Sequence, residues 1–377
     1  MAAKKLLYID PQCPPGHASF NGIWIKALAE SGTFDVTLAF PAEYERRLDY
    51  DRRKCRFLEI PPSWIPTPGG KNRGPLARLL LRFRRIARLR KMLAFLRPQD
   101  YDLVLLSSFD TPVAFFSPMQ SHFVWVGHNL AEQVDRHAVS RIMLRRIGAK
   151  SHLVALGPYT AEKLQECGVR NVLEIPLGFP PPFRVAGEPP PGMSREIFAP
   201  CKTHCDRKTL DALLSDAMDA VLDETGAKLV LRVGRGTGKH VRVLEGRIPD
   251  DEYAMRMTSS MAILLFYQDG YERNSLILRE AMVSGRPVLM RRLPFYAHLE
   301  GTPGLRFFST REELEAQIRD LASSPACPDY GAVLREENPQ RISEVLETVV
   351  REDAWRRLTD GCRDTTRMQG DESSARR

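Results

Sequence analysis

Residues 269–290 read DGYERNSLILREAMVSGRPVLM, and they decide the fold because they specify a complete loop, helix, turn and strand. Ser275 is a good helix N-cap, and the residues after it are strong helix formers. Gly285 is placed to end this helix, and Pro287 prevents it from resuming before the short apolar strand 288–290. A helix followed so closely by a buried strand is typical of an α/β sheet.

The start of this helix has the features of a phosphate site. The amides of a first turn have no intrahelical partner and carry the positive end of the helix dipole. We therefore expect a diphosphate to bind at the amides of Asn274, Ser275 and Leu276. Glu272 precedes the helix, where its carboxylate can accept hydrogen bonds from sugar hydroxyls. Glu280 lies over one turn further on, where it can hold a ribose. The alternative is an ordinary amphipathic helix with solvated charges.

Short apolar runs alternate with helical patterns along the rest of the chain, which predicts parallel sheets covered on both faces. A proline-rich segment, 176–191, interrupts the alternation and can be neither a helix nor a central strand, so it is the natural linker between two domains. The predicted strands before it are 5–10, 35–40, 56–60, 102–108, 123–127, 153–156 and 172–176. The predicted strands after it are 196–200, 228–233, 241–244, 262–266, 288–290 and 305–308.

The composition limits the class of protein. The chain has 377 residues, enough for two domains, and its 43% hydrophobic and 27% charged residues are ordinary for a globular protein. The net charge of +8 favours acidic partners. Seven cysteines, an odd number, do not indicate a disulfide framework, no run approaches the about 18 apolar residues of a membrane span, and the apolar run 6–9 is too short for a signal peptide. These features predict a cytoplasmic protein.

The opening stretch resembles the signature of the family-four retaining glycosyltransferases, also called glycosyl transferases group 1. Members carry Glu-x7-Glu followed by Ala-Met, a small residue, Gly, x, Pro and a hydrophobic strand. The matching residues are Glu272, Glu280, Ala281, Met282, Gly285 and Pro287. The family usually has Gly-Phe-Gly or Gly-Phe-Pro after the first Glu, and this chain has Arg-Asn-Ser at 273–275. A second alignment puts Asp269 in the place of the first glutamate, so the identity of that acid stays open.

The resemblance implies the GT-B fold, in which two doubly wound, Rossmann-like α/β domains face a cleft and a C-terminal helix can cross back to the first domain. On this basis we expect an acceptor domain at 1–180, a linker at 181–192 and a donor domain at 193–343. A helical segment at 344–369 and a disordered tail at 370–377 complete the expected organisation.

The resemblance also implies a function. Such enzymes transfer a sugar from a nucleotide-sugar donor to a hydroxyl acceptor, here a glycan or lipid-linked acceptor of polysaccharide or lipopolysaccharide synthesis, with retention at the anomeric carbon. The leaving phosphate oxygen is thought to take the acceptor proton, so neither a metal nor another cofactor is expected. Two alternatives remain open: an inactive GT-B-like scaffold in glycan assembly, and a sugar-nucleotide epimerase of the same architecture.

Basic residues follow the first strand of the second domain, at the turn where the family binds the donor diphosphate. Lys202 and Lys208 best match the family positions, with Arg207 a close substitute for the latter; the alternative is a solvated basic loop. The Gly-rich run 234–240 precedes a predicted strand instead of a helix, so it is not a dinucleotide fingerprint. After it, the pair Gly246 and Arg247 matches the family's segment beside the nucleotide base.

Four residues of the first domain are candidates for the acceptor side and one for catalysis. The loop 14–22 matches the family's Gly-rich loop, in which Gly16, His17 and Gly22 line the acceptor before a helix that starts near residue 23. His128 ends an apolar strand, where the family often places a histidine that touches the sugar, and Asp110 ends an earlier strand. The alternatives are a long βα loop and a structural histidine.

Residues 76–97, LARLLLRFRRIARLRKMLAFLR, predict a basic amphipathic helix. Seven of the fourteen residues 78–91 are Arg or Lys. Such a helix can lie on an anionic membrane surface, which makes the inner face of a membrane a candidate location. The alternative is a helix that packs on its own sheet with a solvated basic face. Nucleic acid is not an expected partner, because no aromatic stacking platform accompanies the arginines. The apolar residues that fall roughly on one helical face are Leu76, Leu79, Leu80, Phe83, Ile86, Ala87, Leu93 and Leu96.

Overall fold

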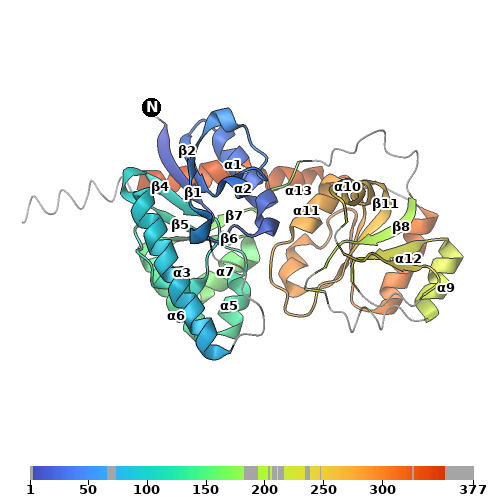
Figure 1. Cartoon of the computed structure of the whole chain (residues 1–377). Coiled ribbons are helices and arrows are strands. Elements are labelled where there is room, and N and C mark those ends of the chain that lie inside the picture. The colour runs from blue at the N-terminus through green and yellow to red at the C-terminus, as the bar shows by residue number, and fades with distance from the viewer. Residues whose placement is uncertain are drawn as a thin grey trace, which may run out of the picture. The chain divides into compact units, whose positions relative to one another are not determined.

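The computed structural model describes residues 3–65, 74–181, 194–202, 204–205, 210, 216–233, 238–246, 248–324 and 327–352. The chain divides into two compact units, Met1–Leu177 with Pro339–Arg377, and Gly178–Asn338 (Figure 1). The linker predicted at 181–192, apart from its first residue, and the tail predicted at 370–377 lie outside the described residues.

The first unit is built on a parallel sheet with the order β3-β2-β1-β4-β5-β6-β7. All seven strands predicted in this half are present, with ends that differ by at most two residues. Their bounds are β1 Lys4–Ile9, β2 Phe34–Phe40, β3 Cys55–Glu59, β4 Leu103–Leu106, β5 Phe123–Gly127, β6 His152–Leu156 and β7 Val172–Ile175. Burial on both faces explains why these strands appear in the sequence as continuous apolar runs.

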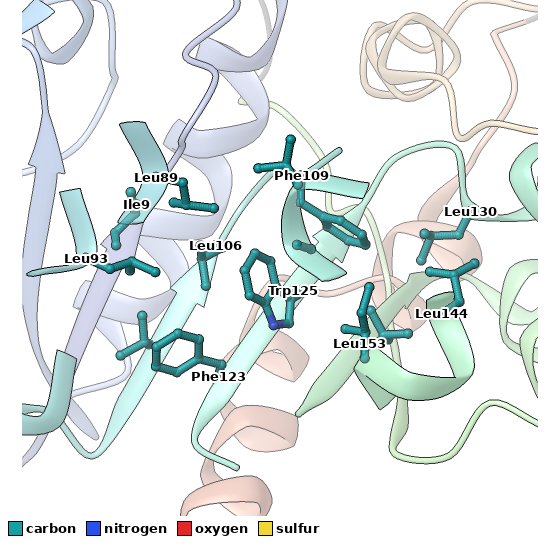
Figure 2. Packing of buried hydrophobic residues seen from close by; sticks show 14 of the residues in the cluster. Ile9, Leu89, Leu93, Leu106, Phe109, Phe123, Trp125, Leu130, Leu144 and Leu153 are labelled. Carbon is teal, nitrogen blue, oxygen red and sulfur yellow. The ribbon is translucent and has the colours of Figure 1, made fainter. Parts of the chain in front are cut away.

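Helices cover both faces of this sheet. One face packs against the second half of α3 and against α4 to α7, and Figure 2 shows this core, in which Leu89 and Leu93 of α3 lie near Ile9 of β1. On the other face, Tyr8 of β1 donates a hydrogen bond to Asn21 of α1. The helices are α1 Ala18–Glu30, α2 Ala42–Glu45, α3 Pro75–Leu96, α4 Thr111–Phe115, α5 Leu130–Arg136, α6 Ala138–Lys150 and α7 Pro158–Glu166.

The second unit has its own parallel sheet, with the order β10-β9-β8-β11-β12-β13. The six predicted strands are present as β8 Ser194–Ala199, β9 Lys228–Leu231, β10 Val241–Val243, β11 Ser260–Leu265, β12 Val288–Arg291 and β13 Leu305–Phe308. The helices described here are α9 Asp216–Thr225, α10 Asp250–Ser259, α11 Leu276–Val283, α12 Arg311–Ser323 and α13 Gly331–Glu336. Because β10 follows the Gly-rich run, the structure excludes a helix directly after those glycines.

Each sheet reverses its strand order at one place, between β1 and β4 in the first unit and between β8 and β11 in the second. The loops after two such strands leave in opposite directions and open a crevice at the carboxyl ends of the strands, which is where open α/β sheets bind ligands. We call these two places, where the strand order reverses, the switch points. Each is the expected position of a ligand site in its unit.

Three predicted helix features need correction. Helix α1 begins at Ala18, earlier than predicted, because Phe20 is buried and extends the packed face; Gly22 therefore lies inside a helix and not in the loop. The C-terminal helix is already formed at residues 340–352, and its start belongs with the first unit. Residues 353–369 of the predicted helical segment lie outside the described residues.

Helix α3 does not have the single apolar face that the sequence suggested. Its second half is buried, with Leu89, Met92, Leu93 and Leu96 in the core, whereas its first half exposes leucines and a phenylalanine. A helix of 22 residues is about 33 Å long, while the six residues of β1 span about 20 Å, so the helix is longer than the sheet it covers. Within the described residues, no helix is long and apolar enough to cross a membrane.

Candidate active site

The predicted phosphate-binding helix forms as α11, and its first turn is capped by a side chain. The Ser275 hydroxyl accepts a hydrogen bond from the amide of Leu278 over 3.0 Å, and Ser275 also lies 2.5 Å from the hydroxyl of Tyr267. Gly285 ends the helix with a φ of +63°, a backbone conformation that favours glycine. Helix α11 therefore begins after Ser275 and ends before Gly285, as the sequence predicts.

Glu280 lies on α11 and is paired with a tyrosine from α10. The Tyr253 hydroxyl donates to Oε2 of Glu280 over 2.6 Å. Burial raises the pKa of Glu280 to about 7, although the hydrogen bond from Tyr253 opposes the rise. Burial and the nearby Glu280 raise the pKa of Tyr253 well above its usual value, so Tyr253 stays a neutral donor. The carboxylate thus changes its charge close to neutral pH.

A stack of tyrosine rings supports the loop that carries Glu272. Tyr267 and Tyr271 stack with ring centroids 4.2 Å apart, and the rings of Tyr267 and Tyr296 are 6.2 Å apart and nearly parallel. The Tyr296 hydroxyl donates to the carbonyl oxygen of Arg273 over 2.6 Å, which fixes the loop directly after Glu272. Glu272 is half-buried in this loop.

The alternative first acid, Asp269, has a different environment. One of its carboxylate oxygens lies 2.9 Å from the guanidinium of Arg291, and its side chain is 78% exposed. Ion pairs with an exposed partner contribute little to stability, and this one holds Asp269 at the surface of the unit.

An ion pair between α11 and the residue directly after α13 helps to hold α11 in the second unit. Arg279 is buried and donates two hydrogen bonds to the carboxylate of Glu337, one of them from Nε over 2.9 Å. The Arg279 guanidinium also lies 5.5 Å from the ring centroid of Phe179. Removing either member would leave a buried charge unpaired, which is costly in proteins.

The loop after β8 lies beside the loop after β11, as the switch point predicts. The amide of Gln268 donates to the carbonyl oxygen of His204 over 2.9 Å, and the Cys205 thiol donates to the carbonyl oxygen of Phe266 over 3.0 Å. Lys202 is exposed on the first of these loops. The structure therefore brings the described part of the predicted basic turn, residues 201, 202, 204 and 205, next to the segment that carries Glu272.

Several predicted donor residues lie outside the described residues. They are Arg207, Lys208 and Arg247. Gly246 is described: it has a φ of +75°, and its carbonyl oxygen accepts a hydrogen bond from Arg232 over 3.2 Å.

The cysteines beside Lys202 do not assemble a metal site in the part of the chain that the structure describes, where no group of three His, Cys, Asp or Glu side chains is arranged to hold an ion. Burial raises the pKa of the Cys201 thiol to about 12, so this side chain is a neutral thiol at physiological pH.

In the first unit, a buried carboxylate occupies the switch point. Asp10 follows β1 and is fully buried; its Oδ1 accepts hydrogen bonds from the amides of Gln12 and Cys13 and from the hydroxyl of Ser108, which follows β4. Its Oδ2 accepts one from Asn21 over 2.9 Å. Burial by itself would raise the pKa of Asp10, but neighbouring His17 and these hydrogen bonds lower it to about 2. Asp10 is therefore ionised at neutral pH.

Two predicted histidines meet beside this carboxylate. Nδ1 of His17 lies 3.4 Å from Oδ2 of Asp10, and the ring of His17 lies 4.3 Å from that of His128, centroid to centroid. Nε2 of His128 lies 3.0 Å from the carbonyl oxygen of Ser107, which can only accept, so this nitrogen is the donor. Phe20 packs edge-on against His128, with centroids 4.6 Å apart.

The other predicted acceptor-side residues are Asp110, Gly16 and Gly22, and each has a separate environment. Asp110 directly precedes α4, and its Oδ2 is 3.3 Å from Nη1 of Arg85 on α3. Gly16 is exposed, and a side chain there would meet nothing within 4 Å. Gly22 is buried in α1 and faces the backbone of Asp49, where an added Cβ would lie 3.4 Å away, an ordinary contact distance.

Sequence reasoning missed two residues that organise these sites. Asp10 reads in the sequence only as the end of a strand, although an acid at the carboxyl end of a central parallel strand is a signal in itself. Tyr253 lies in the middle of α10, and no local pattern marks it as the partner of Glu280.

Solved structures share this architecture of two parallel sheets. No protein-family model matches the sequence, and no curated protein matches it. Among solved structures, the chain is similar to the trehalose-6-phosphate synthase OtsA, with a TM-score of 0.63, 12% identity and coverage of 93% of this chain and 99% of that one. It is also similar to WaaG, a glycosyltransferase involved in lipopolysaccharide biosynthesis, with a TM-score of 0.53, 14% identity and coverage of 92% and 98%.

This chain has the GT-B fold. A UDP-N-acetylglucosamine 2-epimerase is similar as well, with a TM-score of 0.55, 14% identity and coverage of 95% and 97%. Identities this low establish the GT-B fold alone, and one GT-B architecture serves different reactions, so the chemistry has to be argued from the residues.

Proposed function

We propose that this GT-B protein is a glycosyltransferase that moves a sugar from a nucleotide-sugar donor to a hydroxyl acceptor. The observation that carries the proposal is the arrangement around α11: Glu272 precedes the helix, Ser275 caps it, and the half-buried Glu280 follows one turn later. This arrangement lies at the switch point of the second unit, beside the basic loop after β8.

Each group at this site has a role in holding the donor. Glu280 binds the ribose, and the amides at Asn274, Ser275 and Leu276 bind the diphosphate at the start of α11. Lys202 and Lys208, with Arg207, offset the negative charge that grows on the departing diphosphate, so the reaction needs no metal. Gly246 and Arg247 lie beside the base.

Glu272 positions the transferred sugar. The half-buried carboxylate of Glu272 suits this role better than Asp269, whose exposed carboxylate is already paired with Arg291. A protein binds a sugar ring through hydrogen bonds to several of its hydroxyls. A carboxylate in a well-held loop accepts such bonds in a fixed direction.

The first unit supplies the acceptor side. His128 contacts the sugar or the acceptor, and His17, Gly16 and Asp110 line the acceptor, while Gly22 lies buried inside α1. We propose transfer with retention, in which the leaving phosphate oxygen takes the proton of the acceptor hydroxyl. The acceptor is a glycan or lipid-linked molecule, and the exposed first half of the basic helix α3 supports the lipid-linked form.

A thermal-shift screen with UDP-, GDP-, ADP- and CMP-sugars tests the donor site. A ligand at about 100 times its dissociation constant adds about 2.7 kcal/mol to the stability of the folded state. The cognate nucleotide sugar should raise the melting temperature of the native protein, and Glu280→Ala should abolish that shift while the unliganded protein stays folded. An equal shift in Glu280→Ala would contradict the assignment.

Turnover separates the proposal from its alternatives. A glycosyltransferase releases the nucleotide only when an acceptor is present, whereas an epimerase converts the nucleotide sugar without one, and a scaffold does neither. The likeness to a UDP-N-acetylglucosamine 2-epimerase makes that assay necessary. NMR of the anomeric proton in the product then decides between retention and inversion.

A further inference from the structure

Helix α3 has two arginines on the side that faces the core. Met92 is buried in the core of the first unit, and Arg85 and Arg88 lie within about 40° of it around the helix axis, since a helix advances by about 100° per residue. Phe83, which is 60% exposed, lies on the opposite side of the helix. Both arginines are half-buried. A guanidinium stays charged in a protein, so two of them on the core side of a helix need partners.

Both arginines line a pocket at the switch point of the first unit. The pocket has about 370 Å³ of empty space, including the part open to solvent. Gln12, from the loop after β1, and Asp110, from the loop after β4, form part of its wall, and Trp64 and Phe109 add aromatic surface. Apolar walls with a few polar groups directed to one place are typical of small-molecule sites.

The pocket has a surplus of positive charge and of hydrogen-bond donors. Nη1 of Arg85 lies 3.3 Å from Oδ2 of Asp110, so one carboxylate offsets one of the two guanidinium groups. Nε of Arg85 is buried and has no hydrogen-bond partner among the described residues. The same part of the chain provides neither an ion pair nor a hydrogen bond for Arg88. Because buried N–H groups almost always have a partner, these donors indicate an anionic ligand with several oxygens.

We propose that this pocket binds a phosphate group carried by the acceptor sugar. A phosphate monoester has three strong acceptor oxygens and a charge of about −1.5 to −2 at neutral pH, so guanidinium groups on successive turns of α3 can bind it together. A carboxylate has two oxygens in one plane, so a single guanidinium satisfies it and the other stays unpaired. The inference rests on the proposed function for the word acceptor, and it adds that the acceptor is phosphorylated.

Trp64 supplies the wall for the sugar ring. Nζ of Lys91 lies 5.3 Å from the ring centroid of Trp64, and the ring of Phe95 packs edge-on against the same indole, with centroids 5.3 Å apart. These two contacts from α3 hold the indole, which is half-buried, at the pocket. A large, flat and apolar ring can bury the C–H face of a sugar, while the charged groups of the pocket bind its phosphate.

Calorimetric titration of the full-length protein without nucleotide tests the pocket. The probes are glucose 6-phosphate and glucose 1-phosphate, and the comparison compounds are glucose, glucuronic acid and inorganic phosphate. We expect at least one of the two hexose phosphates to bind about tenfold more tightly than every comparison compound, or better, because only the hexose phosphates offer both a phosphate and a sugar ring.

Single substitutions separate the pocket from the net charge of α3. Arg85→Gln and Arg88→Gln should each weaken hexose phosphate binding about tenfold or more, the usual effect of losing a charged hydrogen bond. Arg90→Gln removes an equal charge about 160° away around the helix, where Arg90 donates to the carbonyl oxygen of Phe116, and should leave binding close to wild type. Trp64→Ala should weaken binding of the hexose phosphate but not of inorganic phosphate.

Melting temperatures show whether these variants are folded. Arg85→Gln also removes the partner of Asp110, so it can lower stability. Arg88 has no such partner among the described residues, and Arg88→Gln therefore tests the site even if Arg85→Gln fails to fold. In turnover, Arg88→Gln should raise KM for the acceptor and leave KM for the nucleotide sugar unchanged.

The outcomes distinguish the inference from the proposed function. Failure of the wild type to bind either hexose phosphate, or equal losses in Arg88→Gln and Arg90→Gln, would overturn the site. Inorganic phosphate that binds as tightly as the hexose phosphates would mean that the pocket takes free phosphate, and tighter binding of glucuronic acid would exclude a phosphate site. The pocket is measured without nucleotide, so a failure of every nucleotide sugar to bind would count against the transferase alone.

Discussion

Tyr253 donates a hydrogen bond to Glu280, with its hydroxyl oxygen 2.6 Å from Oε2 of the carboxylate. The bond joins α10 to α11 and occupies one of the two oxygens that a ribose could use. Since Tyr253 stays protonated, it can only strengthen the ionised form of Glu280, whose pKa burial raises to about 7. The donor site therefore changes its charge in the physiological pH range.

Nucleotide-sugar affinity should increase as the pH rises from about 6 to 8. A ribose hydroxyl donates more strongly to a carboxylate than to a carboxylic acid, and Glu280 ionises within this window. Tyr253→Phe should move the midpoint to higher pH, because it removes the hydrogen bond that lowers the pKa of Glu280. Calorimetry with an intact nucleotide sugar is the measurement, since its diphosphate has no titration near neutral pH. A flat profile in the wild type would contradict the assignment of Glu280.

Charge neutralisation of the leaving group predicts a separate kinetic effect. Lys202→Ala and Lys208→Ala should each lower kcat by more than they raise KM, because the charge on the departing diphosphate grows towards the transition state. Initial-rate measurements of nucleotide release give both constants. Activity should persist in EDTA, and strict dependence on a divalent ion would argue against a clamp built from lysines. Lys239→Ala is a suitable control, since Lys239 already pairs with Asp223.

The cap of α11 should matter for both stability and binding. Ser275→Ala removes the acceptor for the Leu278 amide and a partner of the buried Tyr267 hydroxyl, which together cost about 1–3 kcal/mol. Thr310→Ala removes the comparable cap of α12, where the hydroxyl accepts from the amide of Glu313. Denaturant unfolding should show a loss in both variants. Only Ser275→Ala should weaken nucleotide binding, and equal effects on binding would mean that the cap acts through general stability.

The elements of this fold could be predicted from sequence because each depends on local patterns. Apolar runs mark the thirteen strands, and Ser275 and Gly285 mark the two ends of α11. What failed depends on distant contacts. Helix α1 starts early because Phe20 packs in the tertiary structure, and α3 divides into an exposed first half and a buried second half that its local pattern does not mark. The cluster around Asp10 joins residues 98 positions apart, which no local pattern contains.

The buried carboxylate of Asp10 should control the stability of the first unit. Its pKa in the folded state, about 2, lies below its usual value of 3.8, so the stabilisation is complete above about pH 4 and is lost as the pH falls towards 2. Asp10→Asn replaces one carboxylate oxygen by an NH2 group, which has two N–H donors. The surrounding groups, the amides of Gln12 and Cys13 and the side chain of Asn21, are donors as well. At least one donor is then unpaired, which costs about 1–3 kcal/mol at neutral pH.

Denaturant unfolding of Asp10→Asn at several pH values checks this expectation. The difference from the wild type should be largest at neutral pH and should shrink towards pH 2, where about half of the wild-type carboxyl is protonated. Asp35→Asn is the matched control, because Asp35 is exposed and its nearest cation, Arg56, is 3.6 Å away, so its effect should stay within about 0.5 kcal/mol. A difference that is independent of pH would show that Asp10 acts through shape, and not through the charge that faces His17.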